Sequence, residues 1–347
     1  MPDYSYINAR VRGMKGRLFK PADYEELFLM KDPASVIQFL FNSVYGRFIG
    51  SIEKADINAG EEALRRDLSD TFKKIYEMAD KRIKYLLAIL LGRWDVYNIK
   101  TILRGKHINK VSEDIMPLLI PTGVFSEPLL KELTLREDIR DVGVLLSTWG
   151  SPYGHLILEG MEGYKKSGDI SAIELRLEKF YFDDSFKKLS KKKKSGYYVY
   201  KVLTSQIDML NIITALRIVK EKDLAIYADG YFIDNGEMFT KELYQMVINE
   251  KGIMDALSLL NTIPLRKQFK IKKDELSIIS DLPEMERRLE IGILNRAIAL
   301  SLSDPLDISL IIGFIWRKIN EVINLRLILR GKWAEVPDER LRKMVVI

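Results

Sequence analysis

Apolar side chains recur along most of this chain at positions i, i+3, i+4 and i+7, the spacing that gathers them on one face of an α-helix. Asp32 followed by Pro33 marks a helix start, because an aspartate cap suits a proline at the first helical position. Asp141 and Asp255 are expected to start the matching helices further along the chain. The predicted helices cover residues 4–30, a segment opened by Asp32, and residues 61–78, 82–104, 173–189, 285–300 and 305–330. The chain is therefore predicted to be all-α.

One helical motif occurs three times at equal intervals. Each copy has an acid, an asparagine three residues later and an arginine nine residues after the acid, and successive acids are 113 residues apart. The copies are Asp95, Asn98 and Arg104; Asp208, Asn211 and Arg217; and Glu321, Asn324 and Arg330. Three units of this length nearly fill the 347 residues, so the sequence predicts helical repeats over residues 1–110, 111–222 and 223–347.

The acid and the asparagine of each copy fall on an otherwise apolar helix face, so both should be partly buried and need hydrogen-bond partners. The arginine lies half a turn away, in the last turn, where a cation suits the helix dipole. Gly105 and Gly331 follow directly and are expected to end their helices in the left-handed conformation. The favoured interpretation is that all three polar groups bond to neighbouring helices; the alternative is that the arginines face a partner.

Two irregular stretches interrupt the helical pattern. The first is the basic run Lys191, Lys192, Lys193 and Lys194, which is either a solvated turn or a contact for anionic lipid headgroups or an acidic partner. The second is the glycine-bearing stretch 227–236, expected to be a loop with room for a short hairpin. It lacks the lysine and the glycine spacing of a phosphate-binding loop.

Composition and charge narrow the functional classes. With 47% hydrophobic and 30% charged residues, the chain resembles an ordinary globular protein, and its net charge of +6 suits an anionic neighbour without requiring one. It has no cysteine and only two histidines, His107 and His155, which excludes a thiolate or histidine-rich metal site. No familiar catalytic motif occurs, so neither an enzyme nor a cofactor is predicted, and nucleic-acid binding is not favoured.

The chain shows no signal-peptide pattern, and its longest apolar runs, at 86–91 and 310–315, are much shorter than the roughly 20 residues of a membrane-spanning helix. We therefore expect a cytoplasmic protein that is not integral to a membrane.

The opening Tyr4-Ser-Tyr-Ile-Asn-Ala-Arg-Val-Arg-Gly-Met-Lys15 and the helix ends Asn-x-x-x-x-Leu-Arg-Gly-Lys carry a family resemblance. With the triplication and the length, they resemble the C subunits of archaeal and bacterial V-type (A-type) rotary ATPases, the counterparts of the eukaryotic d subunit. The second copy departs from the pattern, because Ile218, Val219 and Lys220 follow Arg217.

The resemblance implies three similar helical lobes in a pseudo-threefold, funnel-shaped arrangement without catalytic residues. It further implies a monomer within the ATPase complex, seated at the membrane on the rotor ring and receiving the foot of the coiled-coil central shaft. Such a protein transmits torque between ATP turnover and ion transport. The alternative function is a general helical scaffold that binds a protein partner through a concave surface.

Overall fold

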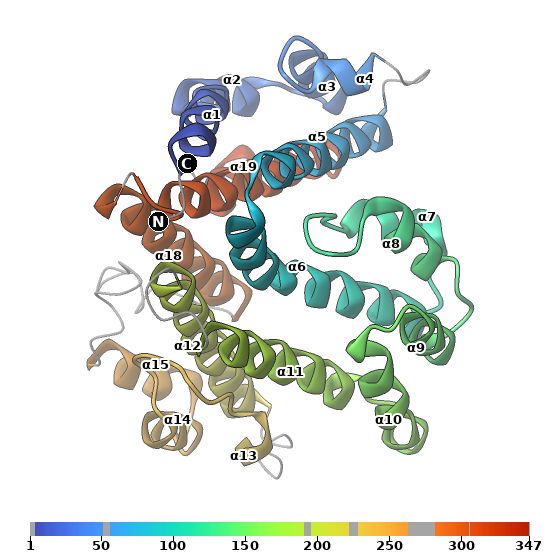
Figure 1. Ribbon diagram of the computed structural model, residues 1–347, viewed down its shortest axis with the longest axis vertical. Coiled ribbons are helices and arrows are strands. Elements are labelled where there is room, and N and C mark those ends of the chain that lie inside the picture. The colour runs from blue at the N-terminus through green and yellow to red at the C-terminus, as the bar shows by residue number, and fades with distance from the viewer. Residues whose placement is uncertain are drawn as a thin grey trace. The chain divides into compact units, whose positions relative to one another are not determined.

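The computed structural model describes residues 4–50, 56–190, 196–221, 228–262, 282–304 and 306–346, and every regular element within these ranges is helical (Figure 1). This confirms the all-α prediction. The chain divides into two compact units, one of Met1–Lys188 with Lys318–Ile347 and one of Leu189–Arg317.

The first unit holds the helices up to the first unit boundary and, at its C-terminal end, α20. They are α1 (Ser5–Lys15), α2 (Pro21–Leu29), α3 (Pro33–Phe41), α4 (Gly46–Ile49), α5 (Ile57–Met78), α6 (Lys81–His107), α7 (Ser112–Ile115), the 3₁₀ helix η1 (Met116–Leu118), α8 (Glu127–Thr134), α9 (Ile139–Thr148), α10 (Pro152–Ser167), α11 (Ser171–Ser190) and α20 (Asp338–Met344). The second unit holds α12 (Tyr197–Lys220), α13 (Ala228–Tyr231), α14 (Lys241–Ile248), α15 (Ile253–Thr262) and α18 (Leu282–Ser303). The boundaries between the units fall within α11 and within α19 (Ser309–Trp333).

Several predicted helix limits are wrong, because a proline or a capping residue sets the actual end of the helix. The helix expected over 4–30 is two helices, because Lys20 precedes Pro21 and takes an extended conformation that a residue before proline favours. The cap at Asp32 is confirmed, since its carboxylate accepts a hydrogen bond of 2.8 Å from the backbone N–H of Ser35. Asp141, however, lies in the first turn of α9, whose actual cap is Asp138. The stretch expected as a loop with a hairpin contains the short helix α13.

The helix α12 is long and apolar enough to cross a membrane by length and composition. In the structure, 83% of its apolar window is buried inside the protein. Ile207, Ile212 and Leu216 are among its buried side chains. Burial of this extent is typical of the central helix of a globular core.

The motif helices α6 and α19 do not end at Gly105 and Gly331, as the sequence had predicted, but run on to His107 and Trp333. The residues with the left-handed backbone are Asn109 (φ 54°) and Glu335 (φ 53°). After each, the next backbone N–H donates a hydrogen bond of 2.8 Å back to the glycine carbonyl, closing the six-residue turn of a Schellman motif.

The two glycines have a packing role instead. A Cβ atom on Gly105 would overlap the side chain of Ile115, and one on Gly331 would overlap Leu341, in each case ten residues later. In the second copy the sizes are exchanged, since the matching positions hold Ile218 and Ala228, both buried. The second copy therefore has a large residue where the other two have the glycine, and a small residue ten positions later.

We predict that Gly105→Ile lowers the free energy of unfolding by about 2 kcal/mol or more, because the crossing is then overpacked. Adding Ile115→Ala reproduces the arrangement of the second copy and should recover part of this loss. Urea denaturation of the two variants measures the difference.

Gly163→Ala serves as the control for the loss of a helical glycine, because nothing lies within 4 Å of the added Cβ. It should stabilise the chain by about 0.5–1 kcal/mol. If Ile115→Ala fails to improve the Gly105→Ile variant, the size exchange does not explain the second copy.

Candidate functional site: the three motif helices

Each motif asparagine binds both backbone groups of a residue 22 positions later. Its amide NH2 donates to the carbonyl of that residue at 2.6–2.8 Å, and its side-chain oxygen accepts from the N–H of the same residue at 2.7–3.1 Å. The pairs are Asn98 with Ile120, Asn211 with Ile233, and Asn324 with Val346. All three asparagines are fully buried. The partner in each case lies in a non-helical segment, not in a neighbouring helix as predicted.

The first two motif acids hold the backbone a few residues further on, just before the next helix. Asp95 accepts from the N–H groups of Val124 (2.9 Å) and Phe125 (3.1 Å). Asp208 accepts from the N–H groups of Met238 (3.0 Å) and Phe239 (3.0 Å). These bonds fix the entry of the chain into α8 and α14.

The chain passes so close to each of these carboxylates that a side chain would collide with it. A Cβ atom on Gly123 would overlap the carboxylate of Asp95, and one on Gly236 would overlap that of Asp208. The two glycines are 113 residues apart, like the acids. Gly236, the last residue of the stretch 227–236, therefore allows the backbone to pass close to the carboxylate of Asp208.

The third acid bonds to the beginning of the chain. Glu321 accepts a hydrogen bond of 2.6 Å from the N–H of Phe19, which precedes α2 as Phe125 precedes α8. Asn324 meanwhile binds Val346, near the other end. The third motif helix thus holds segments from both ends of the sequence, and Figure 1 shows α19 running alongside α5.

Among the described residues, Glu321 also belongs to a buried ionic cluster. Lys318 donates to Glu321 (2.9 Å), to Asp67 (2.8 Å) and to the hydroxyl of Tyr45 (2.9 Å), and Tyr45 donates to Glu321 at 2.6 Å. The side chains of Lys318, Glu321 and Asp67 are only 3–5% exposed. Sequence reasoning missed this cluster, although a lysine three residues before the acid, on the same apolar face, is its visible signal.

The motif arginines lie at the surface. Arg104 makes a two-pronged ion pair with Glu174 on α11, at 2.5 and 2.6 Å, and Arg330 makes the same pair with Glu61 on α5. Their side chains are 56% and 45% exposed, so solvent screens these pairs. Arg217 is exposed on α12. The interpretation that the arginines face a partner stays open beside the ion pairs.

The other residues singled out in the sequence are the run Lys191–Lys194 and the two histidines. The run Lys191–Lys194 lies outside the described residues. His107 bonds through Nδ1 to the hydroxyl of Tyr164 at 2.9 Å, and His155 is exposed. Within the described part of the chain, no group of three or more histidine or acidic side chains is arranged to hold a metal ion.

Burial determines the ionisation of Asp95. It raises the pKa of this carboxyl to about 6 from the usual 3.8, although the N–H groups of Val124 and Phe125 oppose the shift. The folded chain therefore binds this proton more tightly than the unfolded chain does. The resulting stabilisation is complete below pH 3.8 and is lost as the pH rises through about 6.

We predict that Asn98→Ala lowers the free energy of unfolding by about 2 kcal/mol, because it leaves the buried N–H of Ile120 without a partner and removes one of the two hydrogen bonds to its C=O, which Thr122 also donates to at 2.9 Å. Asn211→Ala should cost a similar amount at Ile233. Gln38→Ala, at an exposed position of α3, is the control and should change stability by about 0.5 kcal/mol or less. Urea midpoints that did not separate the asparagine variants from the control would contradict the structural role of the motif.

We predict that the carboxyl of Asp95 titrates with a midpoint near pH 6 in ¹³C NMR of aspartate-labelled protein. Asp32 is the internal comparison, because the N–H of Ser35 holds the pKa of its carboxyl below the usual value. The ionisation of Asp95 should cost about 3 kcal/mol of stability between pH 4 and pH 7, at 1.36 kcal/mol per pKa unit. Asp95→Asn assigns the resonance, and a midpoint at or below the usual value would disprove the effect of burial.

Comparison with known proteins finds relatives along nearly the whole chain. The family model described as ATP synthase (C/AC39) subunit matches residues 7–344. The C subunit of the A-type ATP synthase of Methanococcoides burtonii is 29% identical over 352 residues, covering 99% of this chain and 94% of the relative. That of Haloquadratum walsbyi is 26% identical over 341 residues, covering 97% and 96%. Because the family model spans nearly the whole sequence, this chain belongs to the ATP synthase (C/AC39) subunit family.

Proposed function

We propose that this chain is the non-catalytic central-stalk subunit of a V/A-type rotary ATPase, seated on the membrane rotor ring and acting as the socket of the central shaft. In this position it transmits torque between ATP turnover and ion transport. Family membership and the naming of its relatives as C subunits of A-type ATP synthases support the assignment to such a complex. The observation that carries the socket role is the use of the repeated polar residues to fix backbone segments.

A torque-transmitting part must resist deformation. In the described residues, each motif asparagine and each motif acid bonds to backbone groups at a distant point of the sequence, and the side chains that make these bonds are buried. Buried hydrogen bonds of this kind are costly to break, because the released groups have no water to bind. We call the bonds from each motif asparagine and acid to the backbone a clamp. We take these repeated clamps as the source of the stiffness that the role requires.

We further propose that the three repeats, 1–110, 111–222 and 223–347, build three similar lobes about a pseudo-threefold axis, forming a funnel. Two sets of equal spacings support this arrangement. The asparagine partner is 22 residues away in every copy, and Arg104 and Arg330 occupy the same place opposite Glu174 and Glu61, which are 113 residues apart. The first two motif helices bond to the segment that opens the next repeat, and the acid of the third bonds to Phe19 in the first repeat.

The proposed location is the cytoplasmic side of the cell membrane, peripheral to it, with the chain present as a monomer in the complex. The burial of α12 supports a peripheral position, because an apolar helix covered by protein has no free surface for lipid. The proposed partners are the coiled-coil shaft protein and the rotor ring, with no cofactor and no nucleic acid. The run Lys191–Lys194 is retained as a candidate contact for lipid headgroups or for an acidic partner.

We predict that the purified chain binds both the coiled-coil shaft protein and the detergent-solubilised rotor ring of the rotary ATPase from the same cells. Pull-down with each partner separately, followed by mass determination of the complex, measures the stoichiometry. One shaft protein per chain is the expected result.

The Asn98→Ala and Asn211→Ala double variant provides a test of stiffness. It should still bind both partners below its unfolding midpoint but reduce ATP-driven ion transport relative to ATP hydrolysis, because a softened clamp transmits less torque. If the unmodified chain binds neither partner in the pull-down, the socket role is rejected and the general scaffold is the function to pursue.

A further inference from the structure

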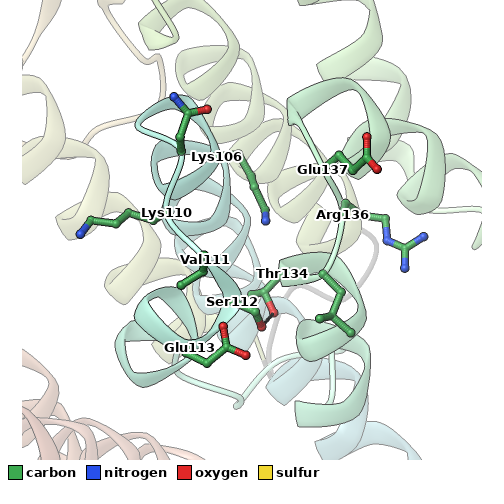
Figure 2. A pocket seen from close by; sticks show the side chains of 10 residues that line it. Lys106, Lys110, Val111, Ser112, Glu113, Thr134, Arg136 and Glu137 are labelled. Atoms are coloured by element: carbon green, nitrogen blue, oxygen red, sulfur yellow. Dashed lines mark hydrogen bonds between the residues drawn. The ribbon is translucent and has the colours of Figure 1, made fainter.

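An open pocket of about 340 Å³ lies at the C-terminal end of the first motif helix. It is formed where the end of α6, the start of α7 and the end of α8 meet (Figure 2). Three of its lining residues are basic, namely Lys106, Lys110 and Arg136. Figure 2 shows the Lys106 side chain extending into the space in front of Ser112 and Thr134, whereas Lys110 and Arg136 extend to either side.

The third copy shows how the same lysine is used when its partner is present. Lys332 matches Lys106, and its amine donates to the carboxylate of Asp338 and to the carbonyl of Phe28, both at 2.7 Å. Its side chain is only 5% exposed. An internal carboxylate therefore completes the lysine site at the end of α19.

The first copy has the lysine without the carboxylate. Ser112 is the first residue of α7, as Asp338 is the first residue of α20, and Ser112 bonds to Thr134 at 2.7 Å. Among the described residues, the amine of Lys106 has no hydrogen bond and no ion pair. The second copy needs no carboxylate partner, because its matching position holds the buried Val219 in place of a lysine.

The charges around the pocket favour one negative charge. The lining holds three basic residues against Glu113 and Glu137, which leaves one net positive charge. Lys110 and Arg136 also have acidic neighbours, Asp114 and Glu132, each at 3.5 Å. Lys106 is thus the cation left to meet a ligand, and a single carboxylate suits the site better than a doubly charged phosphate.

One further feature agrees with an anion here. Burial and the nearby charge of Arg136 lower the pKa of Lys106 by more than the charge of Glu113 raises it, so the chain itself stabilises the ammonium form incompletely. The hydroxyl of Ser112 bonds to that of Thr134, which donates its own proton to the carbonyl of Lys131 at 2.8 Å, so the described structure shows neither hydroxyl bonded to the amine of Lys106.

We propose that this pocket binds a carboxylate side chain of a neighbouring protein of the complex, which takes the place that Asp338 occupies in the third copy. The proposal rests on the proposed function, because it requires a neighbouring protein in the assembled ATPase. The site is a docking point specific to the first repeat, since the other two copies are either filled or apolar.

The test is carbodiimide crosslinking of the assembled complex, because this reagent joins a lysine amine to a carboxylate in direct contact. Mass-spectrometric mapping should find Lys106 joined to an aspartate or glutamate of another protein in the complex. Ser112→Asp should abolish this product and replace it with a link inside the chain, as it supplies the carboxylate internally. Lys31→Gln, at an exposed position outside the pocket, is the control and should retain the product.

Copurification of the chain with the ATPase is scored first, so that the two proposals fail separately. A chain that copurifies but gives no Lys106 product, or a product that Ser112→Asp leaves unchanged, overturns the docking site alone. A chain that does not copurify overturns both. In the isolated chain, inorganic phosphate should not protect Lys106 from acetylation; protection would reassign the pocket to phosphate groups and overturn the carboxylate.

Discussion

The double hydrogen bond between each motif asparagine and a backbone residue 22 positions later is the constraint on which the described structure depends. A side-chain amide can match both the N–H and the C=O of one residue only if that segment passes in one direction and at one distance. Asn98 thereby fixes Ile120, and Asp95, one turn earlier on α6, fixes the chain again at Val124 and Phe125. Two fixed points determine the course of the segment and hence the place where α8 begins.

The third copy applies the same constraint to two segments that are not consecutive in sequence. Its asparagine holds Val346, while its acid holds Phe19, so the backbone groups at the two points belong to opposite ends of the chain. The acid here is a glutamate, one methylene longer than the aspartates, and it carries the added charge partners Lys318 and Asp67. Removing one member of such a buried set would leave an unpaired charge, which is far more costly than losing a surface ion pair.

Amphipathic spacing was sufficient to predict an all-α chain, because it is a local property of the sequence. The prediction of one helix over residues 4–30 missed the break before Pro21, although the residue before a proline avoids the helical conformation. The partners of Asn98 and Asp95 were not predictable, because they are backbone groups, which every residue carries. The role of Gly105 likewise depends on Ile115, which approaches it only in the folded chain.

The three copies agree in the buried clamps and differ at their helix ends. Lys106 faces an open pocket, Val219 is buried, and Lys332 is paired with an internal carboxylate. A strictly threefold socket would offer a partner three equal orientations, whereas a coiled-coil shaft has no threefold symmetry. On the proposed function, the clamps can stay alike because they supply stiffness, and the helix ends must differ because they supply orientation. At the position that holds Lys106, Val219 and Lys332, the three copies of the motif differ in charge.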